Sequence, residues 1–130
     1  MKIIDGKDAV MGRLASHVAK EALKGEELVV VNCSEVVITG NKKTVEREFL
    51  EKRGRFGSSQ KGPKIHRSSE KIVKRSIRGM LPNHRVGRGR DAFKRIKCYD
   101  KVPKEFEGKD LIRLKQGKKI KTNKVKKLNK

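Results

Sequence analysis

The amino-acid sequence of 130 residues predicts a single α/β domain, a small and mostly parallel sheet between two layers of helices. Two observations predict this class. The segments at 2–5, 28–31 and 36–39 are apolar without polar alternation, as in strands that are covered on both faces. Between the first two lies a segment in which apolar residues recur every fourth position, as on a helix: Val10, Leu14, Val18 and Ala22.

The elements of the first half follow the order strand, helix, strand, strand, helix. Gly6 ends the first strand, Asp8 is a candidate N-cap of the helix, and Gly25 stands where a glycine terminates it. The link between 28–31 and 36–39 is too short for a helical crossover. These two strands are therefore expected to be either non-adjacent or antiparallel. The second helix is expected to follow the turn at residues 40–41.

The second half begins with a basic insertion at about 52–68, which has no periodicity and is rich in Gly and Ser. Ser69 is a candidate N-cap for a helix to Met80, which Pro82 prevents from continuing. A short helix near 90–95 and a last strand at 96–99 complete a domain spanning residues 1–103. The basic extension at 104–130 ends with too few large apolar groups for a core, so a flexible tail is expected.

Charge is unevenly distributed along the chain. The formal net charge is +21, from 36 Lys and Arg against 15 Asp and Glu. Residues 52–97 carry a net charge of +14 and residues 113–130 carry +9, whereas residues 1–51 and residues 98–112 each carry −1. Nucleic acid is the expected partner, because neutralised phosphates release condensed counterions. Heparin-like polymers and anionic membranes are the alternatives. No apolar run approaches the ~20 residues that span a bilayer, and the first residues do not resemble a signal peptide.

No pattern of catalytic residues emerges from the sequence. The three histidines (His17, His66 and His84) lack metal-ligand spacing, and Cys33 and Cys98 are expected to be buried, reduced thiols. The TGNKKT segment at 39–44 lacks the glycines of a phosphate-binding loop. It remains open as a plain turn, a site for an RNA phosphate or a nucleotide site. We therefore expect no enzyme, cofactor or metal.

The candidate RNA-binding residues are mostly arginines, whose guanidinium groups bind phosphate bidentately and stack on bases, and tail lysines, which act as mobile point charges. Phe56 is either a base-stacking residue or a packed one. The full candidate set is Lys42, Lys43, Arg53, Arg55, Phe56, Lys61, Lys64, His66, Arg67, Arg75, Arg78, His84, Arg85, Arg88, Arg90, Lys118, Lys119 and Lys121.

Several motifs resemble those of a known family. IRGMLP at 77–82, Gly87-Arg88 and IKCY at 96–99 are similar to the signature of large-subunit ribosomal protein thirteen, the universal L-thirteen family. MGRLA at 11–15 and VVITGNK at 36–42 are similar too, so the resemblance covers about residues 2–103. Val102-Pro103 resembles the archaeal and eukaryotic branch.

This resemblance implies a three-layer α/β/α fold, binding to large-subunit ribosomal RNA and a role early in subunit assembly. It also implies neighbouring ribosomal proteins as partners, a cytoplasmic ribosomal location, and neither cofactor nor catalytic residues. RNA contacts carry over most safely to Arg78 and Arg88. The GMLP motif is expected to end a helix and to bury Met80 and Leu81. We expect no membrane association and no homo-oligomer.

One alternative function belongs to another class, a nucleotide-dependent RNA-modifying enzyme built on the same α/β domain. It would require a cofactor pocket at the carboxyl ends of the strands. A histone-like DNA-binding protein is disfavoured, because no groove-reading motif is evident.

Overall fold

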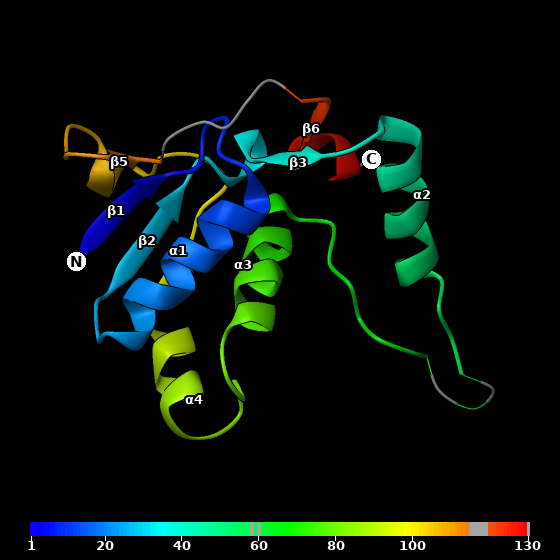
Figure 1. The fold of residues 1–130 in the computed structure, drawn as a ribbon, viewed down its shortest axis with the longest axis horizontal. Coiled ribbons are helices and arrows are strands. Elements are labelled where there is room, and N and C mark those ends of the chain that lie inside the picture. The colour runs from blue at the N-terminus through cyan, green and yellow to red at the C-terminus, as the bar shows by residue number, and fades with distance from the viewer. Residues whose placement is uncertain (58, 60, 115–119, 130) are drawn as a thin grey trace.

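The computed structural model describes residues 1–57, 59, 61–114 and 120–129. Its centre is a parallel sheet in the order β4-β2-β1-β5 (Figure 1). The four strands are β1 (Lys2–Asp5), β2 (Leu28–Val31), β4 (Ile96–Cys98) and β5 (Ile112–Arg113). The predicted mostly parallel α/β architecture is confirmed.

Three helices cover one face of this sheet: α1 (Met11–Leu23), α3 (Ser69–Met80) and α4 (Gly87–Lys94). The strands alternate their side chains between two faces, so Ile4 and Val30 join the helices in the larger core cluster. We call the four strands with these three helices the platform.

The opposite face of the sheet is smaller and is covered without an α-helix. Ile3, Val29 and Val31 pack there against Phe106, which lies in the 3₁₀ turn η2 (Lys104–Phe106). The second layer of helices that the sequence predicted is therefore replaced, in the described part of the chain, by a folded-back segment of irregular chain.

The segment after β2 passes through the 3₁₀ turn η1 (Cys33–Glu35) and enters β3 (Val37–Thr39), which leaves the central sheet. This confirms that the strands near 28–31 and 36–39 are non-adjacent. β3 instead pairs antiparallel with β6 (Thr122–Lys124), close to the other end of the sequence.

The prediction of a flexible tail is wrong for its described end, residues 120–129. β6 leads into the 3₁₀ helix η3 (Val125–Asn129), and its first residue, Val125, is fully buried in the core cluster. The backbone N–H of Val125 donates to the carbonyl of Val36 at 2.8 Å. Few apolar residues suffice here, because they fill space left open by the platform.

Three helices begin at other residues than predicted, and one of them is α4, which begins at Gly87 instead of near residue 90. α1 begins at Met11 after the N-cap Val10, not after Asp8, whose φ of 56° places it in the left-handed region. α3 takes Ser68 as its N-cap instead of Ser69. The predicted termination of α1 is confirmed, since Gly25 directly follows the C-cap with a φ of 100°.

α2 (Lys42–Arg53) is the exception among the helices, because it buries none of its residues. Figure 1 shows it standing to the side of α3, joined to that helix by the long segment that follows it. No described helix is long and apolar enough to cross a membrane.

Candidate nucleic-acid interface

Residues 42–68 lie to the side of the platform, and we call them the basic arm. The arm consists of α2 and the segment that returns to α3. It contains nine Lys or Arg and three Glu. Asn41 caps α2 by accepting a hydrogen bond from the N–H of Lys43 at 3.4 Å. This end of the helix is therefore an ordinary capped turn with one of its free N–H groups already used.

A groove of about 530 Å³ separates α2 from α3. Its apolar residues come from six elements and from the returning segment: Met11, Ile38, Val45, Phe49, Ile65, Ile72, Phe93 and Leu128. Six basic residues also line it: Lys52, Lys64, Lys71, Lys74, Arg75 and Arg78. Glu48 is the one carboxylate among the lining residues. The groove is thus apolar with a strongly cationic border.

The motif that ends α3 connects this groove to α4. Leu81 is buried, but Met80 is 43% exposed and its sulfur accepts a hydrogen bond from the Ser16 hydroxyl at 3.2 Å. The expected burial of Met80 is therefore wrong, because the helix turns its last side chain toward the surface beside α1. Leu81 is extended, as the residue before a proline usually is.

A close backbone contact holds α4 against the turn that follows this motif. A methyl group on Gly89 would lie 2.4 Å from the carbonyl oxygen of Pro82 and 2.6 Å from that of Asn83. Only glycine permits this approach, which gives the second glycine of the GRGR segment a structural role.

Phe93 of α4 contacts two side chains near the groove. The Lys74 ammonium lies 5.0 Å above the ring centroid, and His84 meets the ring edge-on with centroids 6.2 Å apart. These cation–π and aromatic contacts orient the side chains between α3 and α4.

The structure brings some predicted RNA-binding residues together and separates others. The groove gathers Lys64, His66, Arg75 and Arg78. The loop before α4 and α4 itself carry another group, made of His84, Arg85, Arg88 and Arg90. The remaining described residues of the set are spread along the basic arm and the start of β6: Lys42, Lys43, Arg53, Arg55, Phe56, Lys61, Arg67 and Lys121. Lys118 and Lys119 lie outside the described residues.

Two of the spread residues have distinct surroundings. Phe56 is 70% exposed, so of its two predicted roles packing is excluded in this structure. The Nε of Arg53 is shielded from solvent, and no described residue hydrogen-bonds it.

Sequence reasoning left three of the six basic groove residues out of the candidate set: Lys52, Lys71 and Lys74. A helical signal could have found two of them, since residues 71, 74, 75 and 78 follow the spacing of one helix face. Lys52 carries no such signal, because its place depends on how α2 stands relative to α3.

The carboxyl ends of the parallel strands, where α/β proteins commonly bind ligands, are filled by the chain itself. Asp5 is 2% exposed and accepts hydrogen bonds from the Asn32 amide at 2.8 Å, the Lys7 backbone at 3.0 Å and the Arg113 guanidinium at 3.1 Å. Burial by itself raises the pKa of Asp5, but these bonds outweigh it and leave the pKa below its usual value. Asp5 is a structural anchor.

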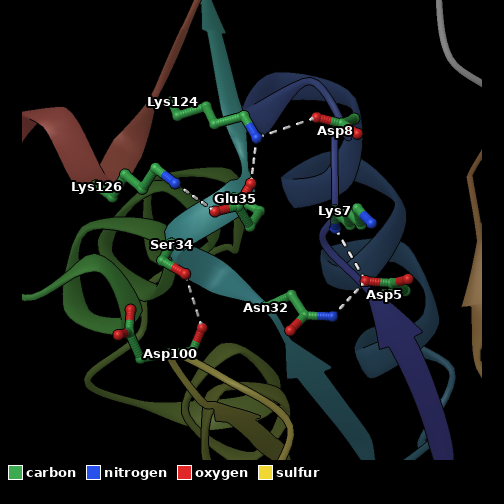
Figure 2. Close-up of polar contacts among 9 residues, drawn as sticks. All are labelled: Asp5, Lys7, Asp8, Asn32, Ser34, Glu35, Asp100, Lys124 and Lys126. Carbon is green, nitrogen blue, oxygen red and sulfur yellow. Dashed lines mark hydrogen bonds and ion pairs between the residues drawn. The ribbon is translucent and has the colours of Figure 1, made fainter.

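Glu35 forms a second anchor beside it, as Figure 2 shows. Its carboxylate accepts hydrogen bonds from the ammonium groups of Lys124 and Lys126, the latter at 2.8 Å. The pKa of Glu35 falls to about 2, first through the bond from Lys124 and then through that from Lys126. Lys124 also lies 3.8 Å from Asp8. These pairs attach β6 and η3 to the platform.

The cysteines give no evidence of a metal site. Cys33 and Cys98 are both free thiols. Cys33 is buried, as predicted, but the predicted burial of Cys98 is wrong, because this residue is half-buried at the end of β4. They are neighbours, and the hydrogen bond with Cys98, followed by burial, raises the pKa of Cys33. Among the described residues, no three His, Cys, Asp or Glu gather where they could hold a metal ion.

Comparison with known proteins agrees with the motifs. The family model for ribosomal protein L13 matches residues 1–105. Three similar proteins, all named large ribosomal subunit protein uL13, come from archaea. The one from Archaeoglobus fulgidus is 44% identical over 86% of this chain and 70% of its own length. That from Methanopyrus kandleri is 47% identical over 81% and 65%, and that from Methanocaldococcus jannaschii is 46% identical over 82% and 79%.

These matches confirm the resemblance and its archaeal and eukaryotic branch. They also agree with the expectation of a structural protein instead of an enzyme, since the relatives are named as parts of the ribosome. The chain belongs to the ribosomal protein L13 family.

Proposed function

We propose that this chain is a structural constituent of the large ribosomal subunit in the cytoplasm, that it binds ribosomal RNA, and that it supports early subunit assembly. The observation that carries this proposal is the separation of charge from fold. The carboxylates of Asp5, Glu21 and Glu35 form ion pairs within the chain, whereas the basic arm, α3 and α4 carry exposed cations.

The exposed cations fit a polyanion better than solvent alone. Arg75, Arg85, Arg88 and Arg90 are exposed, and none of them forms an ion pair within the described part of the chain. Guanidinium groups left free in this way are available to bind phosphates bidentately. Within this proposal, residues 1–103 form the RNA-binding domain with its basic insertion, and residues 104–130 form an extension that partly completes it. Neighbouring ribosomal proteins and ribosomal RNA are its partners.

Cosedimentation with large ribosomal subunits across a salt series tests the proposal. We expect the protein to sediment with the subunit at low salt and to be released steeply as salt rises, because each phosphate contact adds roughly 0.7–0.9 to the slope of log K against log salt. Arg75→Gln with Arg78→Gln should reduce that slope by about one to two.

The matched control is Lys20→Gln with Lys101→Gln, which removes the same charge from exposed positions of the chain outside the groove and α4. It should leave the slope nearly unchanged. A protein that stays free of the large subunit at low salt, or equal slopes for both double variants, would contradict the proposal.

A further inference from the structure

The groove between α2 and α3 has a composition that charge alone does not explain. A surface that only neutralises phosphates needs cations, yet this groove contains eight apolar residues, among them two phenylalanines. Val45 and Phe49 lie on α2, which buries no residue, and both remain half-buried along the groove. They are apolar residues without a partner that covers them completely.

The two phenylalanines are not equally available. Phe93 is engaged by Lys74 and His84. Within the described part of the chain, Phe49 makes no ring or cation–π contact. Phe49 is therefore the groove phenylalanine that has no aromatic or cationic partner among the described residues.

The charges around the groove select an anionic occupant. Six Lys or Arg line it against Glu48 alone, and no carboxylate of the described residues forms an ion pair with any of the six. The few remaining polar side chains in the lining are Thr39, Ser76 and His66. Hydroxyl groups both donate and accept hydrogen bonds, so they suit the edge of a nucleobase without selecting one base strictly.

The size of the groove suits a nucleotide. A volume of about 530 Å³ lies within the usual range for small-molecule sites.

We propose that this groove binds an unstacked nucleobase of single-stranded RNA, stacked on Phe49, with the adjoining phosphates on the lysines and arginines that border the groove. The proposal rests on the proposed function and adds a recognition mode to it: the protein reads unpaired nucleotides as well as backbone charge. Aromatic stacking of this kind tolerates any base and is a common device for single strands.

A pair of matched oligonucleotides tests the proposal. One is a ten-residue strand in which every position is abasic, and the other is identical except for a single central 2-aminopurine. Both carry the same phosphates, so any difference in affinity comes from the base. We expect the purified full chain to bind the 2-aminopurine strand about fivefold or more tightly than the abasic strand, with quenching of its fluorescence on stacking.

Two variants on one helix locate the base. Phe49→Ala should abolish the preference for the 2-aminopurine strand while keeping the affinity for the abasic strand. Leu50→Ala is the matched control, because Leu50 is 59% exposed on the same helix and does not line the groove. It should keep the preference intact. Neither residue is part of the buried core, so both variants should fold.

The outcomes separate this inference from the proposed function. Equal binding of the two strands by the unaltered protein would overturn the nucleobase site and leave charge-based RNA binding intact; a helix of another protein would then be the better occupant. A preference that survives Phe49→Ala would also overturn it, since the base would lie elsewhere, for instance on Phe56. Failure to bind either strand at low salt would count against RNA binding itself.

Discussion

The platform and the basic arm use opposite kinds of residue. The platform contains nearly all of the fully buried side chains, whereas α2 in the arm buries none. The arm has three times as many Lys and Arg as Glu. This difference teaches that buried side chains of the platform provide stability, whereas exposed side chains of the arm and of the outer faces of α3 and α4 are available for recognition, so mutations should affect one without the other.

The largest expected effect comes from truncating the platform. Ile77 of α3 is fully buried against α1 and the sheet, so Ile77→Ala should lower the free energy of unfolding by about 2–5 kcal/mol. Leu50→Ala in the arm should change it by less than about 0.5 kcal/mol, because Leu50 is exposed. Urea unfolding measures both. Similar losses for the two variants would break the comparison.

The described end of the tail, residues 120–129, tests this comparison further, because its composition resembles that of the arm and its packing resembles that of the platform. Val125→Ala should cost roughly 1–3 kcal/mol of unfolding free energy, since it empties a fully enclosed site beside Val36. Ile120→Ala is the control in the same segment, and with 63% of Ile120 exposed it should cost almost nothing. If Val125→Ala left the thermal unfolding midpoint unchanged, the tail would resemble the arm, which contributes little to stability.

Two glycines of the signature region differ in the space around them, so the same substitution should change stability in opposite directions. Gly89→Ala should destabilise the protein by about 1–3 kcal/mol, because its methyl group would overlap the carbonyl oxygens of the turn before α4. Gly79 has open space around it within α3, so Gly79→Ala should be stabilising by about 0.5–1 kcal/mol. Opposite signs in the thermal midpoints are the expected result.

The smallest effect concerns the ion pairs that attach the tail. The pKa of Glu35 is lowered from 4.5 to about 2, so its contribution to stability is present above pH 4.5 and is lost as the pH falls toward 2. Glu35→Gln should remove a small stabilisation at pH 6 and should converge with the unaltered protein near pH 2. The effect is small because the pairs are exposed to solvent.

The control for this pH dependence is Glu27→Gln, which makes the same change of charge at an exposed residue without an ion pair in the described part of the chain. Its unfolding profile should run parallel to that of the unaltered protein between pH 6 and 2. A Glu35→Gln profile that also ran parallel would remove the assigned role of the carboxylate.

Much of the platform could be predicted from the sequence because its signals are local. The uninterrupted apolar runs gave the strands near 2–5 and 28–31, and a four-residue spacing gave α1. β5 and β6 could not be predicted in this way. They are two and three residues long, and their residues are mostly polar, so they form strands only because β1 and β3 offer free edges.

The residue types of the candidate site could be predicted from the sequence, but their arrangement in space could not. Clustered charge pointed to the arm and to α3, and helical spacing could have added Lys71 and Lys74. The groove itself depends on the angle at which α2 stands away from α3. No residue pattern within α2 encodes that angle, because the helix has no buried face that would show as a period.

The pairing of β3 with β6 implies a delay between the synthesis of the two strands. Gly40 and Asn123, which are hydrogen-bonded beside this pair, are 83 positions apart. At about 5–20 residues per second, a ribosome needs roughly 4–17 s to synthesise the intervening chain. During that interval β3 is made but has an open edge, the kind of surface on which strands of other molecules can add. The edge of β3 therefore stays unpaired throughout the synthesis of the second half of the chain.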